Sequence, residues 1–120
     1  MPSPDEVGQA SIHLAVSRLS AGAVVVHVQG EIDMLTAPLF TREVVQVLDP
    51  TDNLLALDMA RVGFLGASGL SALVDILDAV ERTGSRLCVV FPSRAVRRAL
   101  DVVGMPGRFN VYPAPVQLAS

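Results

Sequence analysis

Residues 54–74 read LLALDMARVGFLGASGLSALV and pass from an apolar strand, through a corner of small residues, into a helix. The run 54–59 is almost continuously apolar, which is typical of a central strand covered on both faces. A second apolar fragment, 62–65, precedes the corner. From Leu70 the apolar residues recur at helical spacing until Gly84 ends the helix. The stretch therefore predicts a strand–helix unit of an α/β fold.

Similar units lie on both sides of this stretch. The remaining predicted elements are strands over 11–19 and 23–32, a helix from Thr36 to Leu48, a strand over 86–91, a helix from Ser93 to Val103 closed by Gly104, and a last strand over 109–112. The short link between the first two strands predicts an antiparallel hairpin. Strands that then alternate with helices predict right-handed crossovers. The expected fold class is therefore α/β, with a mixed, mostly parallel sheet and the order β-β-α-β-α-β-α-β.

Length and composition limit what the chain is. At 120 residues, of which 51% are hydrophobic, it is expected to form one domain with a modest core. Residues 1–10 and 113–120 read as tails, which leaves a domain over 11–112. No apolar run approaches the roughly 18 residues that span a bilayer, and no leader is recognisable. We therefore expect a cytoplasmic protein that does not bind a membrane.

Charge and reactive residues exclude several functions. The net charge is −3 and the nine basic residues are all arginine, which argues against general nucleic-acid binding. Without lysine, neither Schiff-base chemistry nor a P-loop lysine is available. The lone cysteine, Cys88, excludes an internal disulfide and a cysteine metal cluster, and it reads as a core residue. No cofactor and no metal are expected.

The corner raises the question of what Ser68 does. The sequence Gly-Ala-Ser at 66–68 matches the first half of a nucleophile elbow, but Leu70 stands where the second glycine belongs. A nucleophilic serine also needs a base, and the only histidines, His13 and His27, lie in the opening hairpin. We expect Ser68 to cap the helix by accepting a backbone hydrogen bond. A small hydrolase using Ser68 is the least favoured hypothesis.

Two blocks, GEIDMLTAPLF at 30–40 and LDMARVGFLGASGLSALV at 57–74, together resemble the STAS domain. They are most similar to the single-domain anti-sigma factor antagonists of bacteria, whose pattern is Gly-Glu-apolar-Asp, Thr-Ala, and later apolar-Asp-Ser-Ser/Thr-Gly-Leu. The resemblance covers about residues 11–112. It implies a cytoplasmic regulator without a cofactor. Such a regulator binds an anti-sigma factor, itself a serine kinase, and so releases a sigma factor.

The chain departs from this family at the phosphorylation site. Ser68, Gly69 and Leu70 match the end of the motif. Gly66, however, stands where aspartate is expected, and Ala67 stands where the phosphorylated serine is expected. The resemblance therefore implies an antagonist that lacks the usual switch. Ser68 is only a weak candidate for phosphorylation.

The resemblance also predicts where a partner binds. The expected contact residues are Asp33, Thr36, Ala67, Ser68, Gly69 and Ser71. Thr36 is also expected to cap the first helix, and Asp33 either braces that helix or offers its charge to the partner. An alternative function is a degenerate STAS subunit of a larger complex, such as a lipid transporter, that uses the same surface. The sequence leaves homodimer formation open.

Overall fold

The computed structural model describes residues 11–19, 22–102 and 109–112. The elements in chain order are β1 (Ile12–Arg18), β2 (Ala23–Ile32), α1 (Ala37–Val47), β3 (Leu54–Leu65), α2 (Ala67–Arg82), β4 (Arg86–Val90), α3 (Arg94–Val102) and β5 (Asn110–Tyr112). The predicted order and the α/β class are confirmed. The two predicted tails and the predicted end of the third helix at Gly104 lie outside the described residues.

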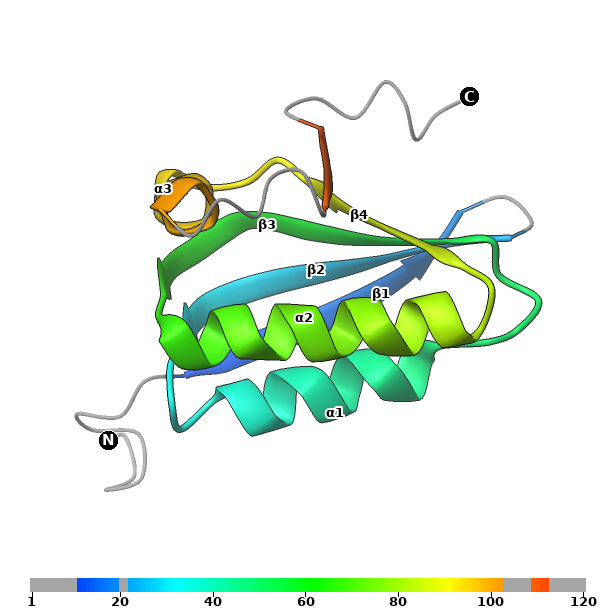
Figure 1. Cartoon of the computed structure of the whole chain (residues 1–120), viewed down its shortest axis with the longest axis horizontal. Helices are drawn as coiled ribbons and strands as arrows, with labels where there is room; N and C mark the ends of the chain where they lie inside the picture. Colours follow the sequence, from blue (N-terminus) through cyan, green and yellow to red (C-terminus); the bar gives the residue numbers. More distant parts are fainter. Residues whose placement is uncertain (1–10, 20–21, 103–108, 113–120) are drawn as a thin grey trace.

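The described strands form one sheet in the order β1-β2-β3-β4-β5. β1 pairs antiparallel with β2, which confirms the predicted hairpin, and the other neighbouring strands pair in parallel. α1 and α2 lie side by side on one face of the sheet, and α3 lies near the end of β3 (Figure 1). The parallel crossovers therefore bring the starts of α1 and α2 to the same edge of the sheet.

β3 is longer than the sequence predicted. The two apolar fragments over 54–59 and 62–65 belong to one continuous strand of 12 residues. Two register shifts against β2, between His27 and Gln29 and between Gly30 and Glu31, carry the pairing through the polar residues between the fragments. The ladder of β2 thus keeps this less apolar segment extended.

The second half of β3 reaches past β4. β4 pairs only with Leu54–Asp58, so the carbonyl groups beyond Asp58 on that edge need other donors. Ser93, just before α3, supplies two of them. Its N–H donates to the Met59 carbonyl at 3.1 Å, and its hydroxyl donates to the Val62 carbonyl at 2.6 Å. α3 is therefore attached to the projecting end of β3, next to the start of α2.

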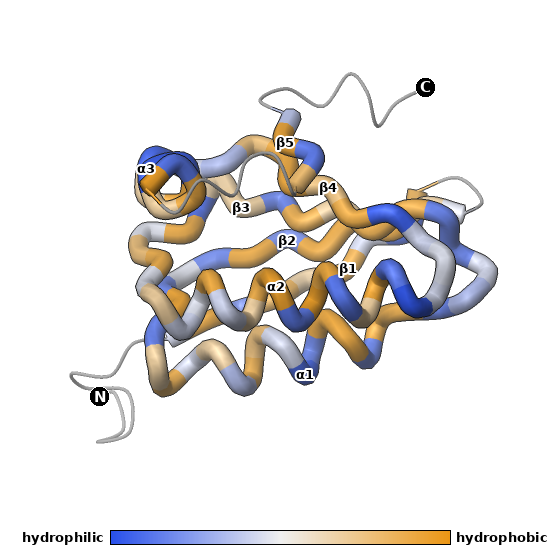
Figure 2. Tube along the Cα trace, in the orientation of Figure 1, coloured by the Kyte–Doolittle hydropathy of each residue, from blue (hydrophilic) through white to orange (hydrophobic). Residues whose placement is uncertain are grey.

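The main core lies between the sheet and the helices. Its largest fully buried side chains are Phe40, Ile32, Leu55, Leu57, Met59, Leu73, Ile76 and Leu100. Figure 2 shows hydrophobic residues concentrated along the strands, while polar residues recur along the helices. Each such side chain contributes about 1.5–3 kcal/mol when it leaves water. The helices are consequently held by their apolar stripes, as their periodicity predicted.

A second, smaller cluster lies on the other face of the sheet. It consists of Val25, Ala56, Cys88 and Val90. Cys88 is buried, as predicted for a core residue. Burial raises the pKa of its thiol to about 11, because the thiolate would lose its hydration. Cys88 thus packs as a small apolar side chain.

Candidate functional site

The predicted contact residues follow the ends of β2 and β3. Ile32 and Leu65 are partners in the register of these parallel strands, so the chain leaves both strands at one edge of the sheet. The Gly66 N–H donates to the Ile32 carbonyl at 3.0 Å and ties the two exits together. Ligands of open α/β sheets bind at this carboxyl edge. The two helix starts at this edge therefore form a candidate site.

The loop before α1 is closed by reciprocal hydrogen bonds. The Thr36 N–H donates to Asp33 Oδ1 at 3.0 Å, and the Asp33 N–H donates to Thr36 Oγ1 at 2.9 Å. The two bonds resemble those of a capping box but lie in the turn before α1, whose N-cap position is occupied by Thr36. The Thr36 hydroxyl also donates to the Glu31 carbonyl at 2.7 Å. The pair thus holds the exit from β2 in a defined turn.

These bonds correct one prediction and sharpen another. Thr36 stands at the start of α1 as expected, but its hydroxyl turns back into the loop and makes no cap bond to α1 within the described residues. Its side chain is buried, because it fills the turn. The Thr36 N–H, followed by that of Leu35, holds the pKa of the Asp33 carboxyl below its usual range. Asp33 therefore braces the helix start, and its contact with a partner stays a prediction.

The prediction that Ser68 caps α2 is wrong. α2 begins at Ala67, with Gly66 at the N-cap position in an extended conformation. Ser68 is therefore the second helical residue, and no side chain in the described part of the chain caps this helix. The helix starts two residues earlier than predicted because Gly66, not Ser68, takes the N-cap position. The Leu70 N–H donates to the Gly66 carbonyl at 3.0 Å.

Gly69, the third residue of α2, is buried against the end of β2. A Cβ at this position would lie 2.9 Å from Ile32 Cγ2 and 3.1 Å from the Ile32 carbonyl oxygen. Because that oxygen belongs to the backbone of β2, it cannot move aside as a flexible side chain would. Gly69 therefore lets α2 approach the sheet closely, and this short distance sets the position of Ala67 and Ser68 relative to the end of β2.

Two hollows flank the first turn of α2. One, of about 430 Å³, lies toward α3, and its lining includes Phe64, Ala67, Leu70, Arg98 and Val102. The other, of about 280 Å³, lies toward α1, and its lining includes Met34, Pro38, Ser68, Ser71 and Asp75. Ala67 and Ser68 are neighbours in the sequence, but successive helical residues point in different directions. They consequently face different hollows.

Exposed apolar side chains gather around these hollows. Met34 is 77% exposed, Leu35 69%, Phe64 50% and Val102 79%. The exposure of these four side chains was not predicted, because Phe64 and Val102 stand within apolar elements of the sequence. A signal was available at Met34 and Leu35, which stand in the loop where no element can bury them. Exposed apolar groups that gather in one place mark an interaction surface.

The hypothesis of a hydrolase centred on Ser68 finds no histidine base in its hollow. Among the described residues that line it, none is a histidine. His13 and His27 instead line a separate hollow on β1, β2 and β3. No group of three or more His, Cys, Asp and Glu side chains in the described ranges is arranged to hold a metal ion. No helix in the described part of the chain is long and apolar enough to cross a membrane.

Comparison with known proteins gives consistent relatives. The anti-sigma-F factor antagonist RsfB of Mycobacterium tuberculosis is 26% identical over 91 residues, which are 76% of this chain and 74% of RsfB. The crystal structure of an anti-sigma factor antagonist from Mycobacterium paratuberculosis is 32% identical, with a TM-score of 0.75, over 95% of this chain and 92% of that one.

A further solved structure matches the fold, and a family model matches most of the chain. The Bacillus cell fate determinant SpoIIAA, in its phosphorylated form, has the same fold at 15% identity and a TM-score of 0.67, over 89% of this chain and 96% of SpoIIAA. The family model of the STAS domain matches residues 15–117. This match spans both helix starts and all the strands but the first residues of β1. The chain therefore belongs to the STAS domain family, among whose solved members it resembles the anti-sigma factor antagonists.

Proposed function

We propose that this protein is an anti-sigma factor antagonist. It binds an anti-sigma factor of the serine kinase type and thereby releases a sigma factor. The observation that carries the proposal is the set of exposed apolar and small side chains on both sides of the first turn of α2. We call this set the corner surface: Met34, Phe64, Ala67, Ser68, Ser71 and Val102. The likeness to antagonists from two mycobacteria supports the class of partner.

The corner surface has the composition of the centre of a protein interface. Phe64 offers a half-exposed aromatic ring beside Ala67, and large aromatic side chains anchor many interfaces. Ala67, Ser68 and Ser71 are small, so a partner can approach the helix backbone closely. Each hollow has one charged lining residue, Arg98 in the first and Asp75 in the second, and interfaces commonly combine an apolar centre with polar groups around it. A partner would therefore bury an apolar centre inside a polar rim.

The two hollows also indicate how phosphorylation at position 67 would release a partner, and why Ala67 prevents this. A phosphate at position 67 would place about −1.5 to −2 charges in the apolar hollow beside Phe64, where docking has to exclude water. Desolvation of that charge would release the partner. Ala67 cannot accept a phosphate, so this route is closed. A phosphate on Ser68 would enter the other hollow, beside Asp75, where the like charges would repel each other.

The binding test compares two arginine substitutions in the full chain. Ala67→Arg places a long cation in the hollow beside Phe64, and we expect it to weaken binding of a purified anti-sigma factor by at least about tenfold in isothermal titration calorimetry. Val45→Arg is the matched control, because Val45 is 38% exposed but lies in the last turn of α1. It should leave the affinity within about twofold.

Equal affinities of both variants and the wild type would place the interface elsewhere. Thermal unfolding of each variant checks that a loss of binding does not reflect a loss of fold. Capture of a transporter subunit from the native cell, with no anti-sigma factor bound, would favour the alternative function instead.

A further inference from the structure

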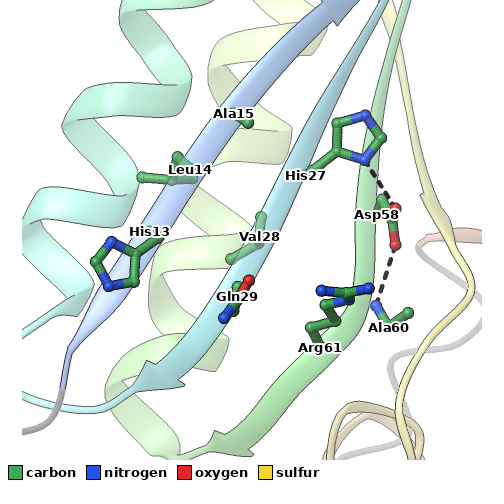
Figure 3. A pocket seen from close by; sticks show the side chains of 9 residues that line it. All are labelled: His13, Leu14, Ala15, His27, Val28, Gln29, Asp58, Ala60 and Arg61. Carbon is green, nitrogen blue, oxygen red and sulfur yellow. Dashed lines mark hydrogen bonds and ion pairs between the residues drawn. The ribbon is translucent and has the colours of Figure 1, made fainter.

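A second polar array lies on the face of the sheet that α1 and α2 leave uncovered. His27 Nδ1 is 2.8 Å from Asp58 Oδ2, and His27 Nε2 is 3.3 Å from Ser17 Oγ. Figure 3 shows His27 and Asp58 side by side, with His13 at the far end of the same hollow. The three members come from β1, β2 and β3. The array is separate from the corner surface and from the proposed function.

Strand register brings these three side chains together. Ala15 is the partner of His27 and Ser17 is the partner of Val25, so Ser17 is the diagonal neighbour of His27 on one face of the hairpin. His27 and Asp58 are direct partners across the parallel pair of β2 and β3. No local motif connects the three positions, because they are separated by 10 and 31 residues.

The hydrogen bonds of a neutral His27 fit one direction of proton transfer. A carboxylate only accepts, so in this form the imidazole donates its Nδ1–H to Asp58, and its Nε2 accepts from the Ser17 hydroxyl. The other oxygen of Asp58 accepts from the Ala60 N–H at 3.1 Å, which holds the carboxylate in place. Nucleophile, base and orienting group thus stand in the order required for acyl transfer.

Access and space suit a small ester. Ser17 is exposed, and the side chains of His27 and Asp58 are 46% and 23% exposed. His27 and Asp58 line a hollow of about 340 Å³ together with Ala15, Gln29 and Arg61, and Ser17 is hydrogen bonded to His27 outside this lining. The bond from Ser17 to His27, at 3.3 Å, is as long as those of many acyl-transfer sites before a substrate enters. An acyl group can therefore reach the hydroxyl from solvent.

We propose that Ser17 is an acyl-accepting nucleophile, with His27 as its base and Asp58 as the residue that positions His27. Ser17 Oγ bonds to the carbonyl carbon of an activated ester while its proton passes to His27 Nε2. The bond to the leaving oxygen breaks, and that oxygen takes the proton from His27. Water then attacks the acyl-serine while His27 Nε2 takes its proton. The same proton passes to Ser17 Oγ, which frees the acid and restores the Ser17 hydroxyl.

The test uses para-nitrophenyl acetate and the full chain. Intact mass and peptide mapping should show one acetyl group, located on Ser17, and nitrophenolate should be released at the same time. Ser17→Ala should abolish this acetylation; because the residue is exposed on an edge strand, the variant should fold. His27→Gln should slow acetylation by at least about tenfold, since a general base contributes about 10²–10⁴-fold.

The role of Asp58 needs a separate readout. In the wild type, nitrogen NMR of the imidazoles should show the His27 tautomer with its proton on Nδ1. Asp58→Asn should change the population of this tautomer and slow acetylation of Ser17, because an amide can donate as well as accept. A residue that only supported the fold would not alter the tautomer in a variant with unchanged thermal unfolding.

The control is the other histidine, at the far end of the hollow. His13→Gln should leave acetylation of Ser17 within about twofold, because His13 lies two strand positions beyond Ala15 and its imidazole is remote from His27 (Figure 3). The proposal is overturned if the wild type releases nitrophenolate no faster than Ser17→Ala and Ser17 gains no acetyl group. It is also overturned if acetylation is spread over several residues, or if His27→Gln acetylates as fast as the wild type.

Discussion

The starts of α1 and α2 lie at the same edge of the sheet but are built in different ways. α1 follows a turn in which Asp33 and Thr36 hydrogen bond to each other, and the Ala37 N–H donates to the Asp33 carbonyl at 2.8 Å. α2 follows Gly66, with no capping side chain in the described ranges. One start satisfies its own polar groups, while the other presents small residues and open backbone. This difference favours the start of α2 as the place where a partner docks.

Restoring the family residues at the start of α2 should have the largest effect. In Gly66→Asp with Ala67→Ser, a hydroxymethyl group replaces the methyl group beside Phe64, and we expect the chain to gain one phosphate. Incubation with ATP and the kinase partner, followed by intact mass, measures this. The new aspartate has to displace the Phe64 ring, which would lie 3.0 Å from its Cβ.

The control for this restoration is the wild-type chain under the same conditions. It should gain no phosphate, because Ala67 has no hydroxyl and Ser68 faces the other hollow. A stoichiometric phosphate mapped to Ser68 of the wild type would show that the two sides of the α2 start do not differ as we propose.

Packing under the start of α2 should have the next largest effect. Gly69→Ala places a Cβ 3.1 Å from the Ile32 carbonyl oxygen, so α2 has to move away from β2. We expect the free energy of unfolding to fall by about 1–3 kcal/mol in denaturant titration. Gly63→Ala is the matched control, because its nearest neighbour would be a side-chain oxygen of Glu31 at 3.6 Å. Equal stability of the two variants would contradict the close approach.

The charge at the start of α1 should have the smallest effect. Asp33→Asn keeps the shape but weakens the hydrogen bonds from Thr36 and Leu35, so we expect a lower melting temperature at neutral pH. The folded-state pKa of Asp33 is lowered, so its contribution is present above its unfolded pKa of about 3.9 and is lost as the pH falls further. The difference between variant and wild type should therefore shrink in acid.

The same variant tests the alternative role of Asp33. Unchanged affinity for the anti-sigma factor, together with the lower melting temperature, is expected for a residue that braces the helix. Weaker binding with an unchanged melting temperature would instead assign Asp33 to the partner contact.

Two serines in the same sequence context differ in the structure, so the sequence alone could not predict which of them caps a helix. Ser68 and Ser93 each follow a strand and precede a helical run, a pattern that predicts a helix cap at both positions. Ser93 does cap α3, accepting from the Val96 N–H at 3.2 Å. It is held there by its bond to the Val62 carbonyl, a contact across 31 residues. Ser68 has no equivalent anchor among the described contacts, and Gly66 starts the helix earlier.

Periodicity and residue identity were sufficient for the element order, the hairpin, the burial of Cys88 and the missing hydroxyl at Ala67. These properties depend on each residue and its near neighbours in the chain. The separate hollows of Ala67 and Ser68, and the meeting of Ser17, His27 and Asp58, emerged only in the folded chain. Both depend on helix phase and on register between strands, because a shift of one residue turns a side chain to the opposite face of a sheet.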